Sequence, residues 1–183
     1  MQPTDTDTRI LYLLRDPNRR EQGFRLLVST YGDRLYQHVR RMVQSHEDTD
    51  DVLQNTFVKV YRNFDRFREQ SQLYTWLYRI ATNESLTFLE RRKRQRHLFM
   101  DDTDNGISAT QVAEVEVDGE FIRRKLDLAI AQLPPKQKAV FSMRYFEEKS
   151  YQEMAVIFTT SVGALKASYH HAVKKIESYL SEG

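Results

Sequence analysis

One segment of the sequence combines aromatic, amide and basic side chains in the way that nucleic-acid binding requires. Residues 74–85 interleave aromatic rings with hydrogen-bonding side chains, namely Tyr74, Trp76, Tyr78, Arg79, Thr82, Asn83 and Ser85. Aromatic rings stack on unpaired bases, and Asn and Thr side chains can bond the edge of an extruded base. The basic run that follows (Arg91, Arg92, Lys93, Arg94 and Arg96) can contact phosphate. The segment therefore predicts contact with unpaired DNA.

Each part of this segment also has a purely structural interpretation. Trp76 shares a helical stripe with Leu73 and Ile80, which favours a place in the core. Tyr74 lies off that stripe and is the better candidate for stacking on a base. The basic run could simply end a helix where the helix dipole favours cations.

A second segment mixes acidic and apolar residues. Glu47, Asp48, Asp50 and Asp51 crowd the start of a predicted helix, and Asp50, Asp51 and Gln54 are followed by Phe57, Val58 and Tyr61. A charged rim around an apolar anchor suits docking on a basic protein helix. The alternative is compensation of the helix dipole together with ordinary core packing. A metal site is a third possibility, but neither HExxH nor EF-hand spacing is present.

The C-terminal part shows the pattern of a helix-turn-helix. Ser150 and Glu153 form a capping box that opens a short helix over residues 151–158. A brief turn at Thr159-Thr160 precedes Ser161, which is positioned to cap a helix reaching Leu180. One side of that helix is apolar, and the other displays small and basic residues, namely Gly163, Lys166, Ala167, His170 and Lys174. This face could read a DNA groove or be only the solvated side of a helical pair.

The remaining helices and the charge distribution suggest how these segments are held. Apolar residues spaced three and four apart predict a helix from Phe24 to Val43, another after its cap Ser45, and a third after its cap Ser71; residues 1–20 show little pattern. Residues 98–120 lack a sustained apolar period and are read as a flexible acidic linker. Net charge is +5 over residues 1–97, −7 over residues 98–120 and +4 over residues 121–183. Two basic blocks flanking an acidic stretch suggest two domains that meet a polyanion.

Composition excludes several classes of protein. The 183 residues include no cysteine, which removes disulfides and Cys-based metal or nucleophile sites. No apolar run approaches the ~20 residues that cross a bilayer. The N-terminus does not resemble a signal peptide, so we expect a cytoplasmic protein that does not insert into membranes.

Three of these segments, in this order, resemble the bacterial RNA polymerase sigma factors of the extracytoplasmic-function (ECF) group. The segment from Asp48 to Tyr61 is similar to the acidic helix of region 2, and Thr75 to Glu84 with the basic run is similar to its promoter-melting helix. The segment Leu133 to Lys138 and the helix-turn-helix resemble region 4. The resemblance implies an all-α fold of two helical domains joined by the linker. Its parts would be an N-terminal extension (1–20), region 2 (21–96), the linker (97–120) and region 4 (121–183).

The resemblance also implies a role for each set of residues. Docking on the clamp coiled coil of the polymerase β′ subunit would involve Asp50, Asp51, Gln54, Phe57, Val58 and Tyr61. The −10 promoter element would be met by Tyr74, Arg79, Asn83, Arg91, Arg92, Lys93 and Arg94. The −35 element would be met by Ser161, Gly163, Lys166, Ala167, His170 and Lys174. The implied partners are core polymerase through its β and β′ subunits, promoter DNA and an anti-sigma factor, with no cofactor, metal or catalysis.

Two departures and two other classes qualify this interpretation. ECF recognition helices often carry a basic residue near Ser168 and a hydroxyl near Ala167, so this helix offers fewer long donors for guanine. A stand-alone helix-turn-helix regulator would dimerise on a palindrome and ignore polymerase. A helical hydrolase would need a convergent pocket around the acids at 47–51, and no such pocket is evident from the sequence.

Overall fold

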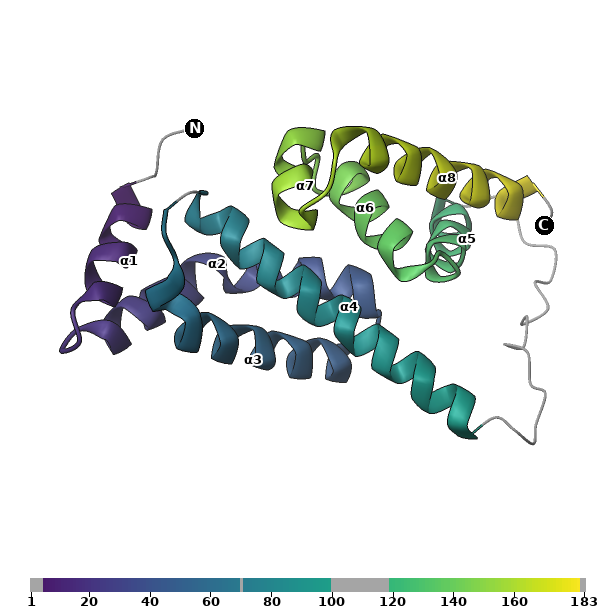
Figure 1. Ribbon diagram of the computed structural model, residues 1–183. Helices are drawn as coiled ribbons and strands as arrows, with labels where there is room; N and C mark the ends of the chain where they lie inside the picture. The colour runs from purple at the N-terminus through teal and green to yellow at the C-terminus, as the bar shows by residue number, and fades with distance from the viewer. Residues whose placement is uncertain (1–4, 70, 100–118, 182–183) are drawn as a thin grey trace.

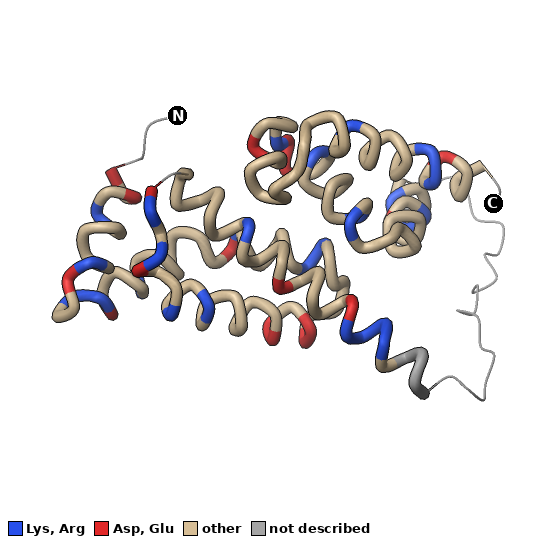
Figure 2. The backbone as a smooth tube through the Cα atoms, viewed as in Figure 1, with Lys and Arg blue, Asp and Glu red and all other residues tan. Residues whose placement is uncertain are grey.

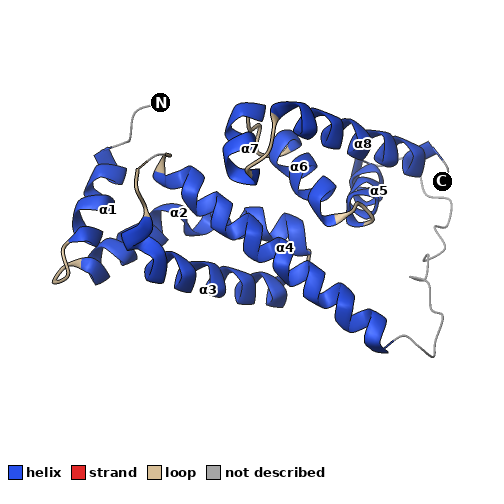
Figure 3. Ribbon diagram, in the orientation of Figure 1, coloured by secondary structure: helices blue, strands red, loops and turns tan. Residues whose placement is uncertain are grey.

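The computed structural model describes residues 5–69, 71–99 and 119–181, and every regular element in these ranges is helical (Figures 1 and 3). The linker predicted at 97–120 falls mostly outside the described residues. Helix α1 (Asp5–Arg15) packs on a first domain of α2 (Arg20–Val43), α3 (His46–Asn63), the 3₁₀ turn η1 (Phe64–Arg66) and α4 (Leu73–Phe99). The second contains α5 (Gly119–Ala131), α6 (Pro135–Tyr145), α7 (Tyr151–Phe158) and α8 (Val162–Ser181). The expected all-α, two-domain fold is confirmed.

Serine caps set several of the helix starts as the sequence predicts. The Asp48 amide donates to Ser45 Oγ, and Ser150 and Glu153 form a reciprocal capping box at α7. The Ala164 amide donates to Ser161 Oγ at the start of α8. The expected cap at Ser71 is wrong, because α4 starts at Leu73 and the Trp76 amide bonds the Gln72 carbonyl. Each confirmed cap satisfies an amide at the helix end that has no partner within the helix.

Helix α1 lies in a segment where the sequence shows little pattern. Its apolar residues Ile10, Leu11, Leu13 and Leu14 are buried against α2, and the Tyr31 hydroxyl donates to the buried Asp7 carboxylate. Gly23 permits this close packing, because a Cβ at that position would lie 2.8 Å from the Leu13 Cβ. The apolar residues span little more than one turn, which is too short to show a period.

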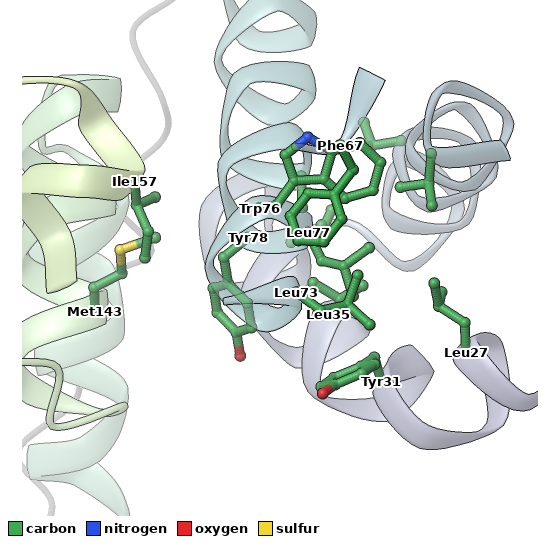
Figure 4. Packing of buried hydrophobic residues seen from close by; sticks show 14 of the residues in the cluster. Leu27, Tyr31, Leu35, Phe67, Leu73, Trp76, Leu77, Tyr78, Met143 and Ile157 are labelled. Atoms are coloured by element: carbon green, nitrogen blue, oxygen red, sulfur yellow. The ribbon is translucent and has the colours of Figure 1, made fainter. Parts of the chain in front are cut away.

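The two domains pack against each other, with α4 against α7 and α6, and α2 against α6 (Figure 1). One cluster of buried residues extends from the first domain, which supplies Leu35, Leu77 and Tyr78, to Met143 and Ile157 of the second (Figure 4). A smaller cluster within the second domain includes Ile130 and Ile176. The sequence reasoning left the relative orientation of the domains open. In the described residues, no helix has the length and apolar character needed to span a membrane.

Candidate functional site

The predicted docking surface lies on the outer side of α3. The inner side buries Thr49, Val52, Thr56 and Val60. On the outer side, Asp50, Asp51, Gln54, Val58 and Tyr61 are exposed and Phe57 is half-buried. The acidic residues lie near the start of α3, where the helix dipole favours them (Figure 2). All six predicted residues therefore belong to one surface.

An apolar groove runs along this surface between α2 and α3. Its volume is about 470 Å³, and it is lined by Glu21, Phe24, Val28, Gln54, Phe57, Val58, Tyr61 and Arg62. The Phe24 ring meets the edges of Phe57 and Tyr61, with centroids 6.2 and 5.1 Å apart. The sequence reasoning did not include Phe24 and Val28, although both lie in the helical pattern that it identified. A groove of this kind, with acids at one end, suits an amphipathic helix carrying basic residues.

The predicted −10 residues are spread along α4. Asn83, Arg91, Lys93 and Arg94 are exposed, and the basic residues form a continuous run near the end of the helix (Figure 2). Arg92 differs from its neighbours because it forms an ion pair with Asp48 of α3. The pair ties α4 to α3, so one of the seven predicted −10 residues is already engaged within the domain.

The aromatic residues near the start of α4 are buried or half-buried. Trp76 is only 7% exposed and packs on Phe67 and Phe64, as its place in the apolar stripe predicts. Tyr74 is half-buried, with its ring centroid 4.4 Å from that of Tyr78. Burial, which is the largest cause, raises the pKa of the Tyr74 hydroxyl well above its ordinary value. Tyr74 is therefore not an open stacking platform in this arrangement.

A basic pocket beside α4 contains residues that the sequence reasoning missed. Arg79 lines it together with Arg66 at the end of η1 and Arg68 just after it, and Phe67, Ser71, Trp76 and Val156 complete the wall. Its volume is about 270 Å³. The signal was present in the sequence, since Arg66 and Arg68 flank Phe67 just before α4. Three guanidinium groups around a small pocket suit an anionic or base-bearing ligand.

The face of α8 follows the sequence prediction closely. Ser161, Gly163, Lys166, Ala167, His170 and Lys174 are all exposed. The opposite side buries Leu165 and Ile176 as expected, and also Ala172, which the predicted stripe did not include. Small residues near the start of the helix leave room for a close approach, and Lys166 and Lys174 supply positive charge. This geometry suits insertion into a DNA groove.

The acids around residues 47–51 do not share one environment. Asp48 is paired with Arg92, whereas Glu47, Asp50 and Asp51 are exposed. No group of three or more His, Cys, Asp or Glu side chains within the described ranges is arranged to hold a metal ion.

Models of two protein families match the two domains separately. The model described as Sigma-70 region 2 matches residues 27–95, and the model described as Sigma-70 region 4 matches residues 123–176. The chain is 32% identical over 166 residues to the ECF RNA polymerase sigma-E factor of Haemophilus influenzae, covering 86% of this chain and 87% of that protein. It is 28% identical over 172 residues to the ECF sigma factor SigW of Bacillus subtilis, covering 88% and 91%.

Two solved structures share the fold. The structure of CnrH in complex with the cytosolic domain of CnrY aligns with a TM-score of 0.68 at 22% identity, over 97% of this chain and 99% of that one. The sigma factor RpoE in complex with the anti-sigma factor NepR, from Bartonella quintana, aligns with a TM-score of 0.65 at 19% identity, over 86% and 96%.

Proposed function

Because the chain belongs to the extracytoplasmic-function group of sigma factors, which are transcription initiation factors, we propose a distinct task for each of its three surfaces. The outer side of α3 binds the clamp coiled coil of the β′ subunit of core polymerase. The exposed part of α4 meets the −10 element, and the exposed face of α8 meets the −35 element. The described helices suggest domains at residues 21–96 and 121–183, and α1 packs on the first of them.

The two DNA surfaces divide the work of opening a promoter. Helix α8 reads a closed duplex, since a single helix fits the major groove. Helix α4 binds bases that the duplex hides, and binding only the open form pulls the equilibrium towards strand separation. Asn83, which is exposed, bonds a flipped-out base, and the basic residues after it contact phosphate. Binding through both surfaces is therefore sensitive to salt.

The observation that carries this proposal is the exposure of the α3 surface while the two domains are packed together. Among the described helices, the second domain packs substantially on α2 and α4 of the first domain, and not on α3. The α3 surface with Asp50, Asp51 and Gln54, and the groove beside it, therefore face away from the second domain. Polymerase can therefore engage the first domain before the domains separate. Once bound, it fixes both DNA surfaces at their working separation and raises their effective concentration.

An anti-sigma factor completes the proposal. The fold is shared with one protein solved in complex with an anti-sigma factor and with another solved with a cytosolic domain of a second protein. For the present chain, the inhibitor holds the two domains together and covers the surfaces that bind polymerase. Co-purification of such an inhibitor from the host supports this part of the proposal, whereas constitutive activity without any partner contradicts it.

The first test is binding to purified core polymerase, followed by run-off transcription and mapping of start sites. Asp51→Ala and Tyr61→Ala should each reduce binding at least tenfold. The matched controls are Asp33→Ala and Tyr12→Ala, which make the same changes at exposed positions outside the α3 surface. Equal binding by all four variants contradicts the assignment of this surface.

Gel filtration in the same experiment separates the other classes of function. A helix-turn-helix regulator would dimerise and would not bind polymerase. A hydrolase would show metal-dependent activity that Asp51→Ala abolishes. A chain that binds neither polymerase nor promoter DNA in the presence of polymerase contradicts the proposed function.

A further inference from the structure

A fully buried histidine lies at the contact between the two domains. His38 of α2 has no exposed surface, and both of its ring nitrogens are within hydrogen-bond distance of an oxygen. Nε2 is 3.0 Å from Thr82 Oγ1 of α4, and Nδ1 is 2.9 Å from Glu147 Oε1, in the turn between α6 and α7. One nitrogen therefore bonds within the first domain and the other bonds across the domain contact.

The Glu147 carboxylate determines the direction of the bond across the domain contact. A carboxylate can only accept, so Nδ1 of His38 carries a hydrogen and donates it to Glu147 Oε1. On the other side of the ring, Thr82 Oγ1 lies 3.0 Å from Nε2 and 2.7 Å from the Tyr78 carbonyl oxygen, and its hydroxyl can bond either of them. The contact is therefore a hydrogen bond from Nδ1–H to a buried carboxylate, and it joins the two domains.

Glu147 is buried together with its partner, since its side chain is only 7% exposed. Burial acts to raise the pKa of this carboxyl, but the hydrogen bond and charge of His38, with the charges of Lys149 and Arg41, outweigh it and hold the pKa below its ordinary value. Its second oxygen, Oε2, is buried without a hydrogen bond. His38 Nδ1–H is therefore one donor that stabilises the charge of this carboxylate, and the Tyr78 hydroxyl interacts with the same group.

Other charged and titratable groups surround this pair. Arg41 lies 3.9 Å from Glu147 Oε1, and the His38 ring is 4.9 Å from the ring of Tyr78. The groups around the pair come from both domains and comprise Arg34, Arg41, Tyr74, Tyr78, Lys149 and Glu153. Among these, Arg41 and Lys149 support the carboxylate.

The same domain contact covers part of the DNA-facing side of α4. Lys149 Nζ lies 4.5 Å from the ring centroid of Tyr74 and 5.2 Å from that of Tyr78. Val156 of α7 forms part of the wall of the basic pocket that contains Arg79. Lys149, in the turn after Glu147, thus lies over the start of α4, and α7 supplies part of the wall of this pocket.

We infer that the free chain is held closed by the buried His38–Glu147 pair, which keeps residues 149–156 over the start of α4 until the domains separate. A buried bond to a carboxylate fixes geometry more than it adds stability, because the cost of removing the carboxylate from water offsets much of the attraction. Separation of the domains hydrates the carboxylate again, so the closed state is specific and yet can be opened by a binding partner. This inference rests on the proposed function only for the statement that the covered part of α4 binds DNA.

The test measures the separation of the domains in the free chain. Because the chain has no cysteine, single cysteines at Ser29 and Lys175 place a donor and an acceptor dye on exposed positions of the two domains. Glu147→Gln keeps the size of the side chain but removes the negative charge that accepts the bond from Nδ1–H of His38. The population with a long dye separation should rise about tenfold relative to the parent chain.

Glu148→Gln is the matched control, because it makes the same change at the exposed neighbouring position and should leave the distances unchanged. Circular dichroism checks that both domains stay folded. His38→Gln is the second variant, and adding it to Glu147→Gln should cause little further opening, because the two residues act as one pair. Long separations in the parent chain, or identical distances in the parent and Glu147→Gln chains, overturn the inference. Polymerase is absent throughout, so failure of this test is distinct from failure to bind polymerase.

Discussion

Helices α4 and α8 are both expected to contact DNA, yet they present their residues in different ways. All six predicted −35 residues at α8 are exposed, whereas Tyr74 and Arg79 of α4 are half-buried and Arg92 is held by Asp48. The contacts that bury one side of α8 come from its own domain. Those that cover the start of α4 come from residues 149–156 of the other domain. Hydrophobic periodicity identifies the first kind of burial and carries no information about the second.

The largest expected effect tests whether α8 has one buried side and one exposed side, as the comparison with α4 assumes. Leu165→Ala removes a side chain that is only 2% exposed, and it should lower the free energy of unfolding of the second domain by about 2–5 kcal/mol. Lys166→Ala, one residue further along, should change it by less than about 0.5 kcal/mol, because Lys166 is exposed. Urea unfolding of the two variants measures the difference. Similar losses in both variants would mean that the face of α8 is not a free surface.

Asn83 tests whether the exposed part of α4 binds unpaired bases. Asn83→Ala should slow promoter opening by about tenfold or more, since a lost base contact costs about 1–3 kcal/mol. Binding to the closed promoter should change little, because the base is hidden in the duplex. Fluorescence of a base analogue in the −10 element reports opening, and Thr87→Ala, at an exposed position one turn later, is the control. Equal losses in closed binding and opening would refute the base-capture role.

Lys166 tests whether the exposed face of α8 meets phosphate. Lys166→Ala should weaken binding to −35 DNA by about 1 kcal/mol and reduce the dependence of binding on salt by about one ion. Lys175→Ala removes the same charge from an exposed position of α8 outside the predicted set and should have a smaller effect. Titration of labelled duplex by the holoenzyme at several salt concentrations provides the measurement. An unchanged salt dependence would remove Lys166 from the interface.

The sequence predicts those features that depend on neighbouring residues. The caps at Ser45, Ser150 and Ser161, and the exposed face of α8, follow from local spacing. Helix α1 was missed because its apolar residues span little more than one turn and are buried by contact with α2. The pairing of His38 with Glu147 joins residues 109 positions apart, and neither side chain shows locally that it has a buried partner. Contacts between domains depend on orientation, which no periodicity encodes.

The smallest expected effect is the opening of the two domains in acid, and the direction of this pH dependence follows from the pKa of Glu147. The pKa of this carboxyl is lowered in the closed chain. Glu147 therefore makes its full contribution to closure at any pH above the pKa that the carboxyl has when the domains are apart. This contribution is lost as the pH falls through the lowered value, because protonation removes the negative charge that strengthens the bond from Nδ1–H. The dye separation should therefore lengthen in acid in the parent chain. In Glu147→Gln this acid-dependent step should be absent.

The pKa of Glu153 is also lowered, chiefly by its bond to Ser150 within the second domain, and this contribution remains in both chains. Acid opening of equal size in both chains would assign the effect to groups other than the His38–Glu147 pair.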